Sequence, residues 1–328
     1  MRKTVFIVLI VSLLLVILMF PLMLTSPQIQ APSDTGHLHH LQIIVDNADT
    51  YFYKQFLGGA RESADFYKAY VEIVPLEQGK TDSLTEAVER GIYAHVDGIA
   101  FRADADMDIQ RLCDIARGNG VQLALYESQS TMAPTPNIAT NAYSIGTSAA
   151  TLAIEATLGD CRAVLVLDKS DGDLSANRSL KLQGVLELFD GYPNAEIVGT
   201  HIVGSDFMAT EQLMDMLFAN KVLNFNIVIC LVETSTPMFA QRILDNTLIG
   251  SVLLIGYGAL PETLDYINRE IIYGSVCPDA YEIGYQTVTE LVTSLGSDIY
   301  GNYSSTTLYF INKQNVSEFI LKQEEDIG

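Results

Sequence analysis

Basic residues are scarce in this sequence of 328 residues. Nineteen lysines and arginines stand against 40 aspartates and glutamates, which gives a formal net charge of −21 at pH 7. A surface with that charge repels phosphate backbones, so we expect no nucleic-acid partner. Apart from a short cluster at 324–326, the acidic residues are spread along the chain, and this distribution indicates a solvated surface.

Tryptophan is absent, and cysteine is rare. The four cysteines, Cys113, Cys161, Cys230 and Cys277, are widely spaced and form no C-x-x-C pair. Four cysteines permit three complete disulfide pairings, and the spacing does not choose among them. Cys230 lies inside the apolar run Ile227–Leu231, so we interpret it as a small buried hydrophobic residue.

Motifs for catalysis and for cofactor binding are also missing. No G-x-x-x-x-G-K-[ST] or G-x-G-x-x-G segment follows a strand, and no G-x-S-x-G or H-E-x-x-H segment occurs. We interpret His37, His39 and His40 as part of a polar linker rather than as metal ligands. His95 and His201 adjoin apolar strands and are interpreted as structural. We therefore expect a protein that is not an enzyme and that uses no cofactor or metal.

A long apolar run is present at the start of the chain. Thr4–Thr25 follows Arg2 and Lys3, and about 20 helical residues are enough to cross a bilayer. The positive-inside rule then places everything after residue 25 outside the cytoplasm. Two alternatives stay open, an uncleaved membrane anchor over residues 1–25 and a cleaved signal peptide. We interpret residues 26–40 as a flexible tether.

The rest of the chain alternates short apolar runs with amphipathic helical patterns. One helix is predicted over Ser83–Ala94 with Asp82 as its N-cap, and Asp104 or Asp106 is expected to cap the next. Continuous apolar runs are typical of strands covered on both faces, so we predict parallel sheets wound on both sides. The predicted strands are Leu41–Asp46, Tyr70–Val74, Gly98–Phe101, Val121–Leu125, Arg162–Leu167, Glu196–Val203, Asn226–Leu231, Ser251–Ile255 and Thr306–Ile311.

Several segments, in order over about residues 41–320, resemble the type I periplasmic binding proteins of the ribose-binding and LacI-like sugar-receptor group. This resemblance implies two doubly wound α/β lobes joined by a three-crossing hinge, with a ligand in the cleft. Lobe 1 would comprise residues 41–141 and 277–303, and lobe 2 residues 142–276 and 304–328. The segments are Asp49–Tyr53, Gly59–Ala64, His95–Phe101, Asn137–Gly146, Leu254–Gly258 and Phe310–Val316.

The resemblance also implies where a ligand would bind. Aromatic rings in the loop after the first strand would stack on a sugar face, with two of the three facing the cleft. Glu127 takes the place of the family's aspartate, and a carboxylate there accepts hydroxyl hydrogen bonds. The implied ligand-binding residues are Tyr51, Phe52, Tyr53, Arg102, Glu127, Asn141, Arg178, Glu233 and Tyr257.

Three positions depart from the family's pattern. Val232-Glu233 stands where the family has asparagine, Gly258 stands for an aspartate, and Val276 stands for a glutamine. Because an unpaired buried polar group costs about 1–3 kcal/mol, the usual sugar specificity is not expected to carry over unchanged. Either the ligand has fewer hydroxyls, or Glu127, Glu233 and Tyr257 supply the polar contacts, or the domain no longer binds sugar.

Two functions follow from these observations. The first is an extracytoplasmic receptor that captures a small polar, sugar-like solute for an ABC-type importer. The alternative is a membrane-anchored sensory or scaffold domain with a degenerate sugar site, which signals to a membrane partner such as a histidine kinase. A transcription regulator of the same fold is excluded, because no helix-turn-helix precedes residue 41 and the charge does not suit DNA.

Overall fold

The computed structural model describes residues 38–45, 51–76, 84–103, 107–128, 134–169, 176–204, 207–220, 222–296 and 303–325. The predicted membrane segment, residues 1–25, and most of the predicted tether lie outside these ranges. Among the residues described, no helix is both long enough and apolar enough to cross a membrane.

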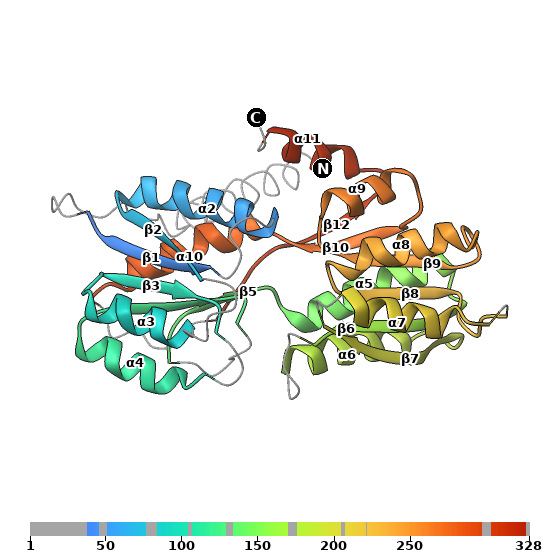
Figure 1. The fold of residues 1–328 in the computed structure, drawn as a ribbon, viewed down its shortest axis with the longest axis horizontal. Coiled ribbons are helices and arrows are strands. Elements are labelled where there is room, and N and C mark those ends of the chain that lie inside the picture. The colour runs from blue at the N-terminus through green and yellow to red at the C-terminus, as the bar shows by residue number, and fades with distance from the viewer. Residues whose placement is uncertain are drawn as a thin grey trace, which may run out of the picture. The chain divides into compact units, whose positions relative to one another are not determined.

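The first lobe is built on a sheet of six parallel strands in the order β11-β5-β4-β3-β1-β2. Helices α2 and α10 pack together on one face, and α3 and α4 contact each other on the opposite face (Figure 1). The strands are β1 (His40–Val45), β2 (Tyr70–Pro75), β3 (Gly98–Phe101), β4 (Gln122–Tyr126), β5 (Asn137–Ala139) and β11 (Tyr303–Ser305). The helices are α2 (Tyr51–Tyr67), α3 (Leu84–Tyr93), α4 (Ile109–Gly118) and α10 (Ala280–Ser294).

The second lobe contains a six-stranded sheet in the order β12-β10-β9-β8-β6-β7. Helices α5 and α6 cover one face, and α7, α8 and α9 cover the other. The strands are β6 (Cys161–Asp168), β7 (Ala195–Val203), β8 (Ile227–Leu231), β9 (Leu253–Tyr257), β10 (Gly274–Pro278) and β12 (Leu308–Asn312). The helices are α5 (Ala142–Thr157), α6 (Ala176–Phe189), α7 (Phe207–Leu217), α8 (Ser235–Asp245), α9 (Pro261–Asn268) and α11 (Val316–Glu325).

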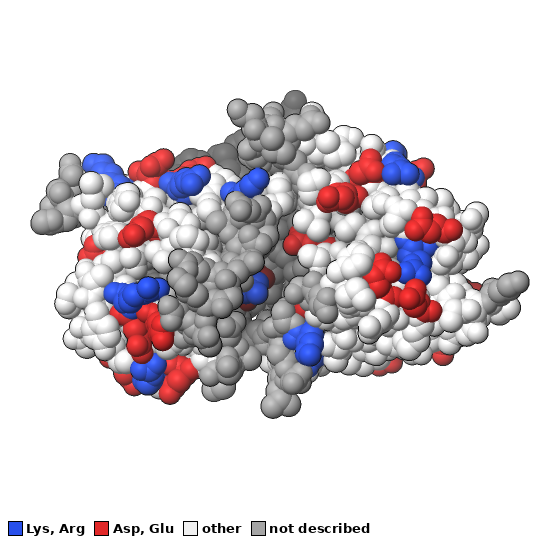
Figure 2. Space-filling model, in the orientation of Figure 1, with Lys and Arg blue, Asp and Glu red and all other residues white. Residues whose placement is uncertain are grey.

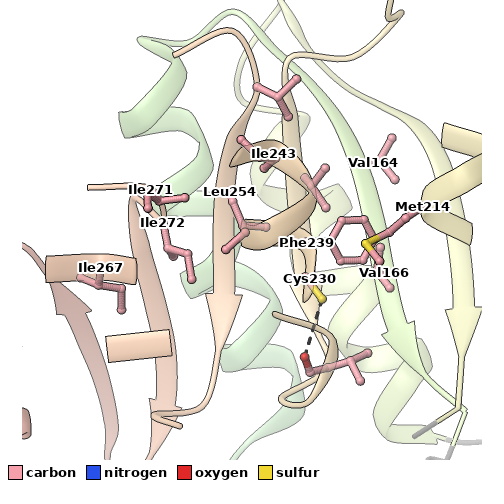
Figure 3. Packing of buried hydrophobic residues seen from close by; sticks show 14 of the residues in the cluster. Val164, Val166, Met214, Cys230, Phe239, Ile243, Leu254, Ile267, Ile271 and Ile272 are labelled. Carbon is pink, nitrogen blue, oxygen red and sulfur yellow. Dashed lines mark hydrogen bonds between the residues drawn. The ribbon is translucent and has the colours of Figure 1, made fainter. Parts of the chain in front are cut away.

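Burial on both faces explains the continuous apolar runs. Along β6, Val164 and Val166 join the core under α7 and α8, whereas the neighbouring Leu165 joins the core under α5 and α6. Figure 3 shows the first of these cores, where Phe239 of α8 and Met214 of α7 lie beside the β6 side chains. The edge strands β2 and β7 are partly exposed, as expected for strands with one neighbour.

The chain passes between the two sheets three times. It leaves the first sheet after β5, returns to the first lobe between β10 and α10, and leaves again between β11 and β12. The two-lobed α/β fold is therefore confirmed. The lobe boundaries remain a prediction, although the sheets place β10 with lobe 2 and β11 with lobe 1.

Four details differ from the sequence prediction. Strand β12 runs antiparallel to β10, and the short strands β5, β10 and β11 were not predicted because their apolar runs are brief. The N-cap of α4 is Asp108, whose side chain accepts a hydrogen bond from the Arg111 amide, rather than Asp104 or Asp106. Tyr51, Phe52 and Tyr53 lie in the first turn of α2 rather than in a loop.

Glycines allow the close helix contacts in both lobes. A Cβ added at Gly284 of α10 would lie 1.9 Å from the Phe56 carbonyl oxygen of α2, which no packing rearrangement of side chains can relieve. In the second lobe, a Cβ added at Gly146 of α5 would lie 2.0 Å from the Lys181 carbonyl oxygen of α6. In each lobe, a glycine without a side chain therefore allows two helices to pack in close contact. In the second lobe this contact also positions Lys181.

All four cysteines are free thiols, which answers the question that the sequence left open. Cys230 is fully buried as predicted, and its Sγ lies 3.6 Å from the Val232 carbonyl oxygen (Figure 3). Burial raises the pKa of Cys113 and Cys161 to about 11 and that of Cys230 to about 12. These thiols are therefore protonated at neutral pH and act as apolar packing groups.

Candidate functional site

The first turn of α2 divides its three aromatic residues between the core and a pocket. Tyr53 is only 4% exposed and packs in the first lobe, where its hydroxyl lies 3.5 Å from that of Tyr126. Tyr51 and Phe52 line the pocket instead. Tyr51 also packs against the core of the second lobe, so this turn touches elements of both lobes.

The pocket has a volume of about 90 Å³ and is lined by residues of both lobes. Its walls include the start of α2, the ends of β8 and β9, and the crossing from β10 into α10. Two carboxylates, Glu233 and Asp279, belong to the lining. Six of the described lining residues are aromatic, namely Tyr51, Phe52, Tyr257, Tyr281, Tyr309 and Phe319.

Glu233 follows β8 and reaches the space left by Gly258 at the end of β9. A Cβ added at Gly258 would lie 2.4 Å from Glu233 Oε1, and Gly258 has a φ of +78°. Burial raises the pKa of Glu233 to about 6, while a hydrogen bond from the Ala259 amide acts in the opposite direction. Glu233 and Gly258, two positions at which the sequence was expected to depart from the family's pattern, are therefore adjacent in the structure.

Glu127 forms a separate polar group at the end of β4. The Thr140 amide donates a hydrogen bond of 2.7 Å to Glu127 Oε1, and Glu127 itself has a φ of +45°. Burial raises the pKa of Glu127, whereas the Thr140 hydrogen bonds and the charges of Lys181 and Arg102 lower it. The structure thus brings Arg102 and Glu127, both predicted from the sequence, close enough for the charge of Arg102 to act on the Glu127 carboxyl.

Lys181 is the functional candidate that the sequence reading missed. It lies on α6 of the second lobe, is only 7% exposed, and acts electrostatically on Glu127 of the first. Its Nζ stands 5.5 Å from the centre of the Tyr257 ring. Arg178, chosen from the sequence, is partly exposed one helical turn earlier and is not part of the described pocket lining. The sequence feature that could have indicated Lys181 is Gly184, which lies one helical turn later on the same side of α6 and packs against α5.

Asn141 has a structural role at the predicted crossover. It is the N-cap of α5, and its side-chain oxygen accepts a hydrogen bond of 3.0 Å from the Ser144 amide. This oxygen is already used by the helix, so a ligand contact would fall to the side-chain nitrogen.

The two valines at altered positions face the protein core. Val232 is 2% exposed and Val276 is fully buried, while their neighbours Glu233 and Cys277 line the pocket. Burial, together with the charges of Glu233 and Asp279, raises the pKa of the Cys277 thiol well above its usual range. The side chains next to the valines therefore provide the pocket surface on β8 and β10.

Basic side chains do not form an extended patch on the face shown in Figure 2. Among the described residues visible there, lysines and arginines are interspersed with acidic side chains. Arg242, for example, is paired with Glu211 and Asp215, both at 2.7 Å. This face is therefore unlike a nucleic-acid-binding surface, which needs clustered positive charge.

A protein-family model described as "Periplasmic binding protein domain" matches residues 41–297. This chain belongs to that family. The family predicted from the sequence segments is thereby confirmed. Solved structures that share the fold are described as sugar-binding or solute-binding proteins, some of them named for arabinose, allose, or glucose and galactose. A search of curated proteins gave no match.

Solved structures of periplasmic binding proteins share the fold at low sequence identity. A sugar ABC transporter sugar-binding protein from Bacillus halodurans has a TM-score of 0.76 and 17% identity, covering 86% of this chain and 100% of its own. A solute-binding protein from Burkholderia graminis in complex with D-arabinose has a TM-score of 0.73 and 20% identity, covering 87% and 99%. The glucose-galactose binding protein GanP from Geobacillus stearothermophilus has a TM-score of 0.74 and 18% identity, covering 85% and 99%.

Proposed function

We propose that this periplasmic binding protein captures a small polar, sugar-like solute outside the cytoplasm and delivers it to an ABC-type importer. The observation that carries the proposal is the pocket lined jointly by both lobes, because closure of two lobes on a ligand is the movement that a permease can detect. The apolar run Thr4–Thr25 would hold the receptor at the membrane, as an anchor or as a signal for export.

The chemistry of the site suits a solute with both an apolar face and hydrogen-bonding groups. Phe52 and Tyr257 offer rings on opposite lobes, and Glu233 adds a carboxylate to the same lining. The solved relatives named for arabinose or for glucose and galactose support a sugar-like ligand as the first class to test. The altered positions predict that its hydroxyl pattern differs from that of a simple pentose.

The sensory or scaffold alternative predicts the same fold, but it predicts no role in solute uptake. No observation on the described residues favours it over the importer role, so we do not propose it. Deletion of the gene separates the two functions. Loss of uptake of the bound solute supports import, whereas intact uptake with a lost transcriptional response to that solute supports sensing.

Ligand binding itself can be tested by thermal unfolding of the full chain in nanodiscs with millimolar pentoses, hexoses and polyols. A ligand that binds only the folded state raises the melting temperature. The Phe52→Ala change should abolish the shift, because it removes a pocket wall, and Phe66→Ala is the matched control. Phe66 lies on the same helix, is 45% exposed and does not belong to the described lining. If both variants retain the shift, the pocket is not the ligand site.

A further inference from the structure

We propose that this pocket selects a solute carrying a positive charge, as a protonated amine or a quaternary ammonium group. This inference rests on the proposed function and narrows its ligand class. Six aromatic side chains and two carboxylates line the pocket, and none of its described lining residues is lysine, arginine or histidine. Aromatic faces and uncompensated carboxylates are the two protein groups that attract an organic cation.

One ring of the lining already lies near an ammonium group of the protein. The Lys181 ammonium stands 5.5 Å from the centre of the Tyr257 ring, within the range of cation–π attraction. Tyr257 contributes to the pocket as well, and Tyr51, Phe52 and Phe319 add further rings from two other elements, α2 and α11. A methylated or protonated nitrogen bound in this pocket would be surrounded by aromatic rings of both lobes.

Glu233 provides the charge that such a ligand would meet. Its pKa responds only to burial and to the hydrogen bond from the Ala259 amide, so no basic side chain of the described structure acts on it. The other acidic group of the pocket is engaged, since Asp279 accepts from the Glu282 amide and from the Tyr309 hydroxyl. Glu233 therefore carries a partly buried negative charge that a bound cation would compensate.

The hydrogen-bond inventory of the pocket points the same way. Carboxylates only accept hydrogen bonds, and two of the tyrosine hydroxyls already donate within the protein, Tyr281 to Glu62 and Tyr309 to Asp279. A polyol needs donors as well as acceptors from its site, and in this lining Gln55, Tyr51 and Tyr257 carry donor groups. An ammonium group needs acceptors and apolar contact alone, which the carboxylates and the rings of the lining supply.

The size of the pocket is consistent with a small head group. Its volume of about 90 Å³ leaves room for a group of a few heavy atoms, such as a trimethylammonium or amino group.

Pairs of probes that differ only in charge test this inference on the full chain in nanodiscs. Choline is compared with its neutral isostere 3,3-dimethylbutan-1-ol, and D-glucosamine with D-glucose, by isothermal titration calorimetry. We expect the charged member of at least one pair to bind about tenfold more tightly or better. Glu233→Gln should reduce that preference to about threefold or less, because it keeps the side-chain shape and removes the charge.

Glu196→Gln is the matched control, because Glu196 is exposed on β7 and outside the described lining. It should leave the preference unchanged. Equal or tighter binding of both neutral members, or a preference that survives Glu233→Gln, would overturn the inference. If neutral sugars alone bind and Phe52→Ala abolishes that binding, the inference fails and the proposed function stands. If no probe and no sugar binds, both fail.

Discussion

Two carboxylates at the ends of parallel strands have opposite surroundings. Glu127, at the end of β4, accepts a 2.7 Å hydrogen bond from the Thr140 amide and lies in the field of Lys181 and Arg102. Glu233, which follows β8, accepts a hydrogen bond from the Ala259 amide, and no basic side chain among the described residues acts on its pKa. The first carboxylate is integrated into the protein, and the second has interactions left for a ligand.

Under the proposed function, this difference assigns Glu127 a structural role and Glu233 a role in recognising the ligand. Glu127 lies where the chain first crosses between the lobes, and its bond to Thr140 ties β4 to that crossing. Lys181 brings the second lobe into the same electrostatic group. Glu233 instead faces an aromatic pocket. Mutations that treat the two residues alike should therefore give different results for stability and for binding.

The largest expected effect on stability comes from Glu127→Ala. It leaves the Thr140 amide without its acceptor and removes a buried carboxylate that interacts with the charge of Lys181, so unfolding should become easier by up to about 3 kcal/mol. Urea denaturation followed by circular dichroism measures this change. Glu127→Gln keeps an acceptor oxygen and should cost about 1 kcal/mol or less.

Glu233→Ala should cost less stability than Glu127→Ala, because its removal leaves only the Ala259 amide to be satisfied. A cost for Glu233→Ala equal to or above that of Glu127→Ala would contradict the division of roles.

A smaller effect on stability is expected from Gly258→Ala, which places a methyl group against the Glu233 carboxylate. The new Cβ meets Glu233 Oε1 at 2.4 Å in a backbone with a φ of +78°. Gly250→Ala is the matched control, since Gly250 has the same φ and no atom within 4 Å of the added Cβ. The control should lose about 1 kcal/mol from backbone strain alone.

Gly258→Ala should lose about 1 kcal/mol more than its control and should weaken ligand binding about tenfold by displacing Glu233. Urea denaturation and calorimetric titration measure the two changes. Equal costs for both glycine variants, together with unchanged affinity, would show that the Glu233 carboxylate moves aside freely.

Much of the fold could be predicted from the sequence because burial on both faces leaves a continuous apolar pattern. The nine predicted strands all occur, displaced by at most two residues at either end. The pattern fails for β5, β10 and β11, which have three to five residues and include polar ones such as Asn137 and Ser275. It cannot show direction either, and β12 pairs antiparallel with β10.

The candidate site was less predictable because contacts between lobes depend on helix register. Lys181 and Arg178 lie one turn apart on α6, and the close contact of Gly146 with the Lys181 carbonyl determines which of them is buried. Asn141 caps α5 through its side-chain oxygen, and its predicted ligand contact stays a prediction for the side-chain nitrogen. Residue type alone does not distinguish a cap from a contact, since both use the same amide group.

The smallest expected effect is a pH dependence that belongs to Glu233. Its pKa of about 6 in the folded protein lies above the value of 4.5 for an unburied glutamate, so the folded state binds the proton more tightly. The contribution to stability is complete below about pH 4.5 and is lost as the pH rises through 6. Glu233→Gln does not titrate, so its stability relative to the unchanged protein should rise by about 1 kcal/mol between pH 4.5 and 7.5.

Urea denaturation of both proteins across this pH range measures the difference, with Glu196→Gln as the exposed control. Because the difference between two proteins is measured, the titration of other groups cancels to the extent that the variant leaves them unchanged. A difference that stays constant with pH would mean that Glu233 finds a compensating positive group in the folded protein. In that case the contrast with Glu127, and with it the case for a cationic ligand, would be lost.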